Sequence, residues 1–297
     1  MAPELKGKGI RGSVRRAGLL PMRYGVGAER IRARLREMTA LLERWELTPT
    51  IPATAVALDR HPEILTEYAS ADPAIHGYHH VSYAGSPREA QARDLDAACD
   101  AFARHGLPTH GFRAPYLRAD GTTRTLLRQR GFEYDSSAVW FALPVGHPAT
   151  VKAMGLTKSR YGNVTTDPAL PVLEDGLVEL PVALPDDEIL VDGLGIGSSA
   201  TLGRIIGTML EIALRSGALL VLQIHPERFH FFSDALEDLL RQAADAGAWM
   251  ASLSEIANWT KAAGGRKWPD GRSMGLAISG DLDAVALTDF GHRILEG

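Results

Sequence analysis

The sequence of 297 residues contains a single cysteine, Cys99, and no apolar run long enough to cross a membrane. One cysteine excludes an intramolecular disulfide and a multi-cysteine zinc site, and the ~18 to 20 consecutive apolar residues of a membrane span are missing. Cys99 stands in an amphipathic stretch, which favours a buried structural thiol over a nucleophile. The basic stretch Lys6–Arg16 is not followed by the apolar segment of a signal peptide, so we expect a cytoplasmic protein.

An excess of positive charge is also missing, because the formal net charge is −4 and no long run of Lys and Arg occurs. We therefore expect no nucleic-acid partner, and we interpret the basic stretch at the N-terminus as a solvated arm. With 45% hydrophobic and 23% charged residues, the composition is that of an ordinary globular protein. No low-complexity linker divides the chain, so we expect one domain over residues 1–297.

Helical and extended segments alternate along the chain. The 3.6-residue periodicity predicts helices over Ala28–Trp45, Ser86–Gly106, Thr122–Gly131, Thr201–Gly217 and Ser233–Gly247. Short apolar segments predict strands between and after them: "TIPATAVA", "GFRAP", "EYDSSAV", "LVELPVAL", "ALLVLQIH", "WMASL" and "GLAIS". This alternation favours an α/β fold with a parallel sheet, open or closed into a barrel. Residues 146–171 are poorly periodic, and we expect a long loop or an insertion there.

His76 and His80 in "AIHGYHHVSY" are candidate metal ligands, because they are four residues apart. On a helical turn this spacing places two imidazoles on one face, close enough to share an ion. The spacing alone is a weak signal, and two structural histidines remain the alternative. A catalytic zinc site usually has three protein ligands, so a carboxylate from another part of the chain is required.

Two further candidates follow apolar segments. Arg113 in "GFRAPY" is either a solvated side chain at the end of a strand or a guanidinium that holds a catalytic carboxylate by a bidentate contact. His225 follows "ALLVLQI" and precedes a polar turn, a position that suits a general acid or base as well as a structural histidine. Parallel α/β folds carry their chemistry at the carboxyl ends of the strands, which is where both residues are expected.

Asp281 and Asp283 follow the apolar segment "GLAIS" near the end of the chain. Two aspartates at the end of a buried strand suit metal binding or acid–base chemistry. Because Asp-x-Asp is common in turns, a surface turn with two solvated carboxylates is the alternative.

The motifs "HGYHHVSY", "GFRAPY", "GFEYDSS", "LVELPVALPDDE" and "VLQIHPE", in this order, resemble the polysaccharide deacetylase family, also called the NodB-homology domain or carbohydrate esterase family 4. The resemblance extends from about residue 28 to residue 259. It implies an α/β fold, a distorted TIM-like (β/α) barrel of seven strands. It also implies metal-dependent removal of an N-acetyl or related acyl group, most often from an amino sugar.

The resemblance implies a role for each matching residue. His76, His80 and Asp283 would bind a divalent metal, with zinc expected and cobalt, iron, nickel or manganese open. Asp281 would be the base, Arg113 would orient it, and Asp135 would in turn brace Arg113. Tyr116 would offer its backbone amide to the oxyanion and His225 would protonate the departing amine. Leu222 and Trp140 would contact the substrate, which we expect to be a carbohydrate or another small molecule.

One departure from the family pattern concerns the order of the motifs. The Asp-x-Asp motif usually ends the first strand, yet the first aspartate of this chain is Asp59. Either the carboxylates are lost in a degenerate homologue, or the first strand is elsewhere. The segment "RKWPDGRSMGLAISGDLDAV" resembles the opening segment of the family. We therefore predict a circular permutation, with a main barrel over residues 27–260 and the first strand and helix over residues 268–297.

Two rival functions remain open from the sequence. One is a catalytically silent carbohydrate-binding protein on the same scaffold, which would lack a metal. The other is an enzyme that cleaves a different carbon–nitrogen bond, such as a formyl amide, a cyclic imide or a ureide ring. The sequence predicts neither the particular substrate nor the oligomeric state.

Overall fold

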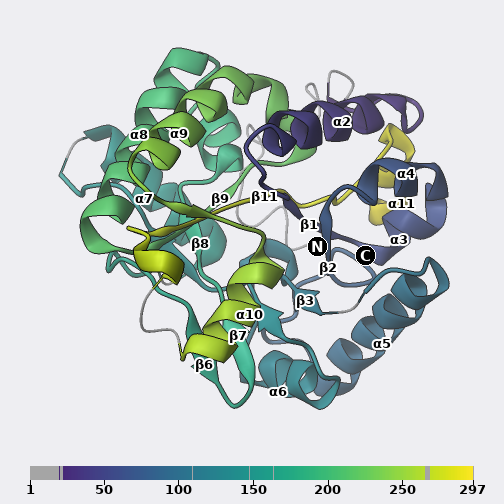
Figure 1. Ribbon diagram of the computed structural model, residues 1–297. Helices are drawn as coiled ribbons and strands as arrows, with labels where there is room; N and C mark the ends of the chain where they lie inside the picture. The colour runs from purple at the N-terminus through teal and green to yellow at the C-terminus, as the bar shows by residue number, and fades with distance from the viewer. Residues whose placement is uncertain are drawn as a thin grey trace.

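A curled, largely parallel sheet forms the centre of the protein (Figure 1). The computed structural model describes residue 20 and residues 23–108, 110–146, 148–162, 164–264 and 268–296. Eleven strands of this described part make one sheet in the order β5-β8-β9-β11-β1-β2-β3-β4-β7-β6, with β10 paired to β11. The strands are β1 (Thr50–Ala53), β2 (Asp72–Ile75), β3 (Gly111–Phe112), β4 (Tyr134–Asp135), β5 (Val139–Phe141), β6 (Val172–Glu174), β7 (Leu177–Glu179), β8 (Val182–Leu184), β9 (Leu219–Gln223), β10 (Trp249–Met250) and β11 (Gly275–Ser279).

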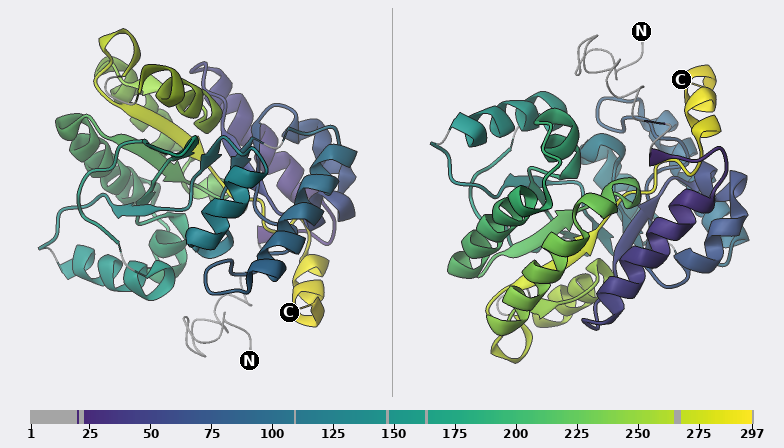
Figure 2. Two further views of the ribbon diagram at one scale, coloured as in Figure 1. Left: turned by 90° about the horizontal axis from the view of Figure 1, so that it is seen from below. Right: turned by 90° about the horizontal axis from the view of Figure 1, so that it is seen from above.

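Helices cover the outer side of the sheet (Figure 2). The α-helices are α2 (Glu29–Glu43), α3 (Ala55–Arg60), α4 (Leu65–Tyr68), α5 (Arg88–Arg104), α6 (Gly121–Gln129), α7 (Pro148–Tyr161), α8 (Ser199–Ser216), α9 (Ser233–Asp245), α10 (Leu253–Ala263) and α11 (Leu287–Glu296). Short helical turns are η1 (Pro62–Ile64), η2 (Pro115–Leu117), η3 (Glu188–Gly193), η4 (Pro226–Phe231) and η5 (Pro269–Gly271). Strand and helix alternate along most of the chain, and the predicted α/β, TIM-like barrel architecture is confirmed.

The five helices predicted from periodicity all form, and each end lies within two residues of its predicted position. Their termini follow ordinary capping chemistry. At the start of α8, the Ser198 hydroxyl accepts a hydrogen bond from the Thr201 amide. At its end, Gly217 takes the left-handed conformation with φ of 64°, which a residue without a side chain adopts at little cost. The helices at these positions are therefore specified locally as well as by packing.

The prediction of a long loop over residues 146–171 is wrong, because most of that segment is helix α7. Its apolar residues are not gathered on one face, so periodicity does not reveal it. The helix packs against η3, where Arg160 lies 3.3 Å from Glu188 and the Tyr161 hydroxyl donates to Asp186. Helix α7 is thereby attached to the chain that leaves β8.

Strand β11 lies inside the sheet although it comes from the C-terminal part of the chain (Figure 1). It pairs in parallel with β9 along its whole length and meets β1 where Ser279 is paired with Thr50. Helix α11, which follows, is held by a 3.1 Å contact between His61 and Asp289. The ring of Phe290 also packs edge-on against Tyr24, with 4.8 Å between centroids. The C-terminal segment therefore supplies an interior strand and a docked helix.

Two predictions concern parts of the chain away from the sheet. None of the helices in the described ranges is both long and apolar enough to span a bilayer. The basic stretch Lys6–Arg16 lies outside the described residues.

Candidate active site

Strands around β1 deliver polar side chains to one edge of the sheet. His76 follows β2, Arg113 follows β3, His225 follows β9, and Asp281 and Asp283 follow β11. These strands run parallel and lie close together in the sheet order, so their carboxyl ends meet at the same edge. The side chains singled out from four distant sequence motifs therefore converge.

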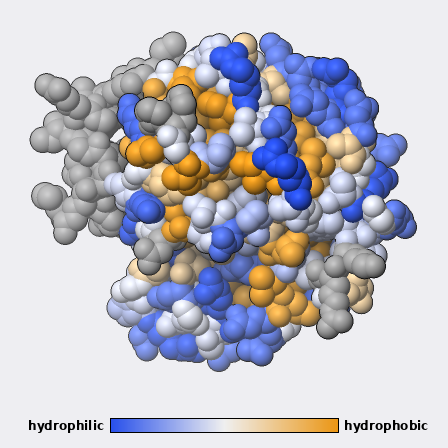
Figure 3. Space-filling model, turned by 90° about the vertical axis from the view of Figure 1, so that its left-hand side faces the viewer, coloured by the Kyte–Doolittle hydropathy of each residue, from blue (hydrophilic) through white to orange (hydrophobic). Residues whose placement is uncertain are grey.

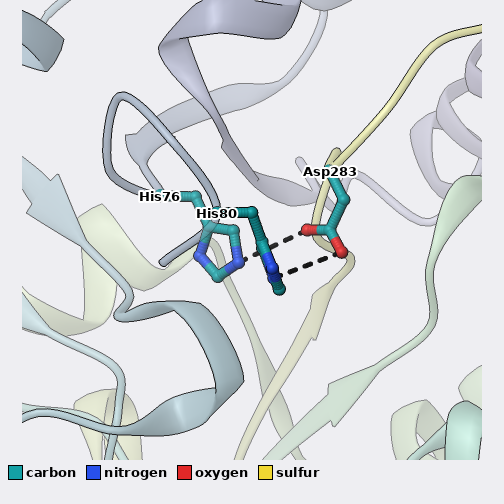
Figure 4. Close-up of side chains that lie close together, drawn as sticks. All are labelled: His76, His80 and Asp283. Carbon is teal, nitrogen blue, oxygen red and sulfur yellow. Dashed lines mark ion pairs between the residues drawn. The ribbon is translucent and has the colours of Figure 1, made fainter. Parts of the chain in front are cut away.

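His76, His80 and Asp283 form a compact group of possible metal ligands (Figure 4). One ligand atom from each residue lies within 4.8 Å of the others. The Asp283 carboxylate faces both imidazoles, at 3.4 Å from His76 Nε2 and 3.3 Å from His80 Nε2. His76 is 1% exposed, so this group lies at the base of the site rather than on an open surface.

The two histidines are presented by an irregular loop and not by the helical turn that their spacing suggests. Gly77 has a φ of 77°, and a Cβ atom there would come within 2.9 Å of a backbone oxygen of the loop. Asp94 on α5 holds the loop by accepting hydrogen bonds from two of its backbone amides and from the Tyr83 hydroxyl at 2.7 Å. A tight turn braced by one carboxylate thus brings His76 and His80 together.

The hydrogen bonding of His76 fits a metal ligand. Its Nδ1 lies 2.8 Å from the carbonyl oxygen of Arg113, so Nδ1 carries the proton and Nε2 presents its lone pair. Among the described residues, no hydrogen bond satisfies this buried Nε2 atom. It faces carboxylate oxygens, which are also acceptors. Nitrogen and oxygen atoms arranged in this way fit a shared cation, and the donor set is one that zinc accepts.

Asp281 lies beside this group and is held by two donors. Arg113 Nη1 lies 2.9 Å from Oδ1, and Gln223 Nε2 lies 2.8 Å from Oδ2. Its Oδ2 is also 3.7 Å from His76 Nε2. Asp281 is 4% exposed, so the guanidinium of Arg113 and the amide of Gln223 hold a carboxylate that is almost completely buried. A carboxylate so placed can accept a proton from a group bound at the neighbouring ligands.

The contact between Arg113 and Asp281 differs from the bidentate pair expected, because one guanidinium nitrogen makes it alone. The other donors of Arg113 reach the Ser136 carbonyl at 3.0 Å, the Ser136 hydroxyl at 2.9 Å and the Ser279 hydroxyl at 3.0 Å. The guanidinium is completely buried, so these neutral acceptors complete its hydrogen bonding.

Burial raises the pKa of Asp135 and the charge of Arg113 lowers it, and a bracing role of Asp135 toward Arg113 stays a prediction. The Asp135 carboxylate accepts from the Ser137 hydroxyl and lies 3.8 Å from Arg124, while the neighbouring Ser136 supplies the bonds to Arg113. Both burial and the charge of Asp135 raise the pKa of Glu179 beside it. Asp135 therefore belongs to a buried carboxyl pair under the site.

His225 is paired with Asp187, a residue that the sequence analysis did not select. Asp187 accepts from His225 Nδ1 at 2.7 Å and from the His225 backbone amide at 2.8 Å. Burial alone would lower the pKa of His225, but the charge of Asp187 and its hydrogen bond raise it well above the ordinary value of 6.5. The signal for Asp187 was present in "ALPDDE", where two aspartates follow the apolar strand β8.

Tyr116 lies in the turn η2 directly after β3, with a positive φ of 59°. Its ring packs edge-on against His80, with 4.4 Å between centroids. The turn that would offer the backbone amide is thus in contact with one of the metal-ligand candidates. The role of the amide toward an oxyanion stays a prediction.

Leu222 and Trp140 are both buried in the sheet. Leu222 is 3% exposed on β9, and Trp140 is completely buried on β5. Consecutive strand residues point to opposite faces, so Leu222 points away from the face on which Gln223 reaches Asp281. Their roles as substrate contacts stay predictions.

Gly280 permits the close approach that places Asp281. A Cβ atom at this position would lie 2.0 Å from the carbonyl oxygen of Ile224. The Gly280 amide also donates to the Thr50 carbonyl at 3.2 Å, which ties the end of β11 to β1. The glycine in "GDLDA" is therefore needed for the strand to pass between β9 and β1 with both aspartates in place.

The surface on the side of α7 and α8 is mixed in character (Figure 3). Apolar patches alternate there with hydrophilic side chains. Large apolar side chains exposed among the described residues include Val145 and Val151, which precede and lie in α7. Scattered apolar exposure of this kind is normal for a folded protein.

Comparisons with known proteins identify the fold. The family model of the polysaccharide deacetylases matches residues 27–134. No curated protein matches the sequence significantly. A crystal structure assigned to the polysaccharide deacetylases from Mycobacterium smegmatis is 23% identical, has a TM-score of 0.61, and is matched over 88% of this chain and 86% of its own.

Two further solved structures are similar. One, assigned to the polysaccharide deacetylases of Pseudomonas aeruginosa PAO1, is 18% identical with a TM-score of 0.59, and the match covers 77% of this chain and 73% of that one. The other, PuuE allantoinase, is 18% identical with a TM-score of 0.58, and the match covers 77% and 72%. The resemblance to the polysaccharide deacetylase family is thus confirmed, and the fold is the fold of that family.

Proposed function

We propose that the protein is a metal-dependent amide hydrolase that removes an N-acetyl or related acyl group from an amino sugar or a sugar-containing small molecule. The observation that carries this proposal is that Asp281 lies beside a three-ligand group and is connected to His225 through the amide of Gln223. Asp281 lies 3.7 Å from His76 of that group, and His225 is held by its own carboxylate partner. A base and an acid beside a metal site are the parts that hydrolysis of an amide requires.

His76, His80 and Asp283 would hold the divalent ion. When bound, such an ion supplies Lewis-acid chemistry, because it polarises a carbonyl group and makes water more acidic. The choice of zinc rests on the two imidazoles and one carboxylate, a set that cobalt, iron, nickel and manganese also accept.

Asp281 would act as the general base and take a proton from the water that attacks the amide carbon. Arg113 fixes the orientation of this carboxylate through its contact with Oδ1. The backbone amide of Tyr116 would donate to the oxygen that becomes negative as the new carbon–oxygen bond forms. Donors that are already fixed in place stabilise this charge without having to reorganise.

His225 would act as the general acid. Asp187 holds Nδ1, which leaves Nε2 to deliver a proton to the amine nitrogen as the carbon–nitrogen bond breaks. The products are a carboxylic acid and an amine. The raised pKa of His225 means that the ring carries this proton near neutral pH.

Cleavage of a different carbon–nitrogen bond, in a formyl amide, a cyclic imide or a ureide, is the second candidate. It is supported by the similar fold of PuuE allantoinase, whose TM-score is close to that of the deacetylase structures. The same base, acid and ligand set would serve that reaction, and the difference would lie in the substrate pocket.

We also propose that the motif order is a circular permutation of the family order. The support is that β11 lies between β9 and β1 and brings Asp281 and Asp283 to the ligand group. The first strand and helix of the barrel would then be residues 268–297 and the main barrel residues 27–260. A cytoplasmic location stays a prediction.

The direct test combines elemental analysis with an activity assay. We expect about one zinc per chain in purified protein and release of acetate from an N-acetylated amino sugar, both lost in Asp283→Ala. Metal without acetate release, but with opening of a ureide or imide ring, would favour the second candidate. Sugar binding without metal or turnover would identify a silent carbohydrate-binding protein and refute the proposal.

A further inference from the structure

Gln223, the last residue of β9, lies between the proposed base and the proposed acid. Its Nε2 atom lies 2.8 Å from Asp281 Oδ2 and 3.4 Å from His225 Nε2. The side chain is 5% exposed, so water does not compete freely for these contacts. One amide nitrogen therefore contacts both groups that would transfer protons.

The charge of Asp281 fixes the direction of the Gln223 amide. Arg113 already donates to Oδ1, and the amide nitrogen is the donor to Oδ2. The reverse orientation would place the Gln223 carbonyl oxygen against an ionised carboxylate, which is repulsive. In the observed orientation this buried oxygen has no hydrogen-bond partner among the described residues.

The same nitrogen faces His225 with its second hydrogen. Asp187 accepts from Nδ1, so Nε2 of the neutral ring is an acceptor and matches the amide donor. When Nε2 is protonated, two donors face each other. Gln223 consequently favours the neutral form of the ring, whereas Asp187 favours the protonated form.

We propose that Gln223 is a positioning residue that fixes the base Asp281 and the acid His225 relative to each other through one amide nitrogen. Its catalytic consequence rests on the proposed amide hydrolase function, whereas its effect on His225 does not. The amide of Gln223 disfavours the protonated ring, whereas Asp187 stabilises it. The protonated ring is therefore a stronger acid than it would be with Asp187 as its partner and no amide at Nε2.

Two charged groups of η4 also act on His225. Glu227 raises the pKa of the ring and Arg228 lowers it, both through their charges. Neither is altered in the test below, so a change in His225 reports on the amide.

The test compares Gln223→Met, which keeps the length of the side chain and removes the amide, with Gln223→Glu. Ring nitrogen NMR signals of His225 are assigned by their loss in a His225→Gln protein and followed against pH. We expect the pKa of His225 to rise by about 0.7 in Gln223→Met, the equivalent of one neutral hydrogen bond. It should rise further in Gln223→Glu, where a carboxylate takes the place of the amide.

Gln91→Leu is the matched control. Gln91 is a buried glutamine on α5 that bonds to Ser86 and Thr123, in contacts separate from those of Gln223. This variant loses a buried amide of the same kind but should leave the His225 signals and their titration unchanged.

The activity measurement is separate from the NMR measurement. We expect Gln223→Met to lower kcat by about 10- to 100-fold with little change in KM, as for other residues that orient a reacting group. An inactive wild-type protein would refute the proposed function and leave the NMR result to decide the contact. Unchanged His225 signals and titration in Gln223→Met would overturn the inference about Gln223, whatever the activity.

Discussion

Arg113 Nη1 lies 2.9 Å from Asp281 Oδ1, although 168 residues separate the two along the chain. The guanidinium is fully buried and Asp281 is 4% exposed. Removing two charges from water is costly, and the cost is offset here by the contact itself and by the three further bonds of Arg113. The pair joins the end of β3 to the end of β11 and fixes the position of Asp281 in the site.

We expect Arg113→Met to destabilise the protein by about 3–5 kcal/mol, because it leaves the buried Asp281 carboxylate without its cation. Urea denaturation of the wild type and the variant measures this difference. The double variant Arg113→Met, Asp281→Leu removes both charges and should recover much of the stability without activity. A double variant as unstable as the single one would contradict this electrostatic explanation.

Substitutions of the two aspartates of the C-terminal motif should have different effects on turnover and on metal binding. Asp281→Asn should retain the metal and lower kcat by about 10²- to 10⁴-fold, since the amide cannot accept the proton of the attacking water. Asp283→Asn should instead lose metal affinity, because a carboxylate ligand is removed. Isothermal titration with zinc and the acetate-release assay distinguish the two. Substantial activity in Asp281→Asn would refute the assignment of the base.

Asp187→Asn should lower the pKa of His225, because burial remains while the main charge that favours the protonated ring is removed. A raised pKa in the folded state contributes stability that is fully present below the unfolded value of about 6.5. This stability is lost as the pH rises through the folded pKa. The variant should therefore be more destabilised at pH 6 than at pH 10, as measured by urea denaturation. An equal loss at both pH values would show that Asp187 acts through packing alone.

The fold follows from the sequence where periodicity is strong. The five amphipathic helices and the alternation with apolar strands predict the barrel class, because burial of one helix face leaves a clear pattern. Two elements give no such signal. Helix α7 has no apolar stripe, and β2 is a four-residue strand that begins with Asp72 and Pro73, both unfavourable in strands.

The site is predicted less completely, since its contacts join residues that are distant in the chain. Motif order selects His76, His80, Asp281 and Asp283, and the structure brings them together. The partner of His225 is 38 residues away, and Gln223 is 58 residues from its carboxylate. Such pairs depend on the sheet order, which spacing does not reveal. The hydrogen bonds between Arg113 and Ser136 were not predicted for the same reason.

A chain truncated before Gly275 tests the permutation. It lacks β11, so β9 and β1 lose the strand between them, and Asp281 and Asp283 are removed. We expect the truncated chain to lose cooperative unfolding, measured by circular dichroism, and to lose zinc binding, measured by metal titration. Supplying residues 268–297 as a separate peptide should restore part of both. A truncated chain that folds and binds zinc as the full chain does would show that β11 is dispensable.

Gly280→Ala tests the close approach of β11 to β9 with a single methyl group. The added Cβ would lie 2.0 Å from the carbonyl oxygen of Ile224, whose own amide donates to the Ser279 carbonyl at 2.7 Å, so the Ile224 backbone is held in place. We expect a loss of about 1–3 kcal/mol or more, the range for overpacking a well-packed core, together with weaker zinc binding because Asp283 is displaced.

Gly207→Ala is the control for that change. Nothing lies within 4 Å of a Cβ atom at Gly207, and the residue is inside α8, where alanine is favoured over glycine by roughly 0.5–1 kcal/mol. The control should therefore be neutral or more stable and bind zinc normally. Both variants add the same methyl group. If only Gly280→Ala lowers the stability, the loss of stability arises from the contact of residue 280 with the chain at the end of β9. Normal stability and zinc affinity in Gly280→Ala would mean that β11 can shift without disturbing the two aspartates.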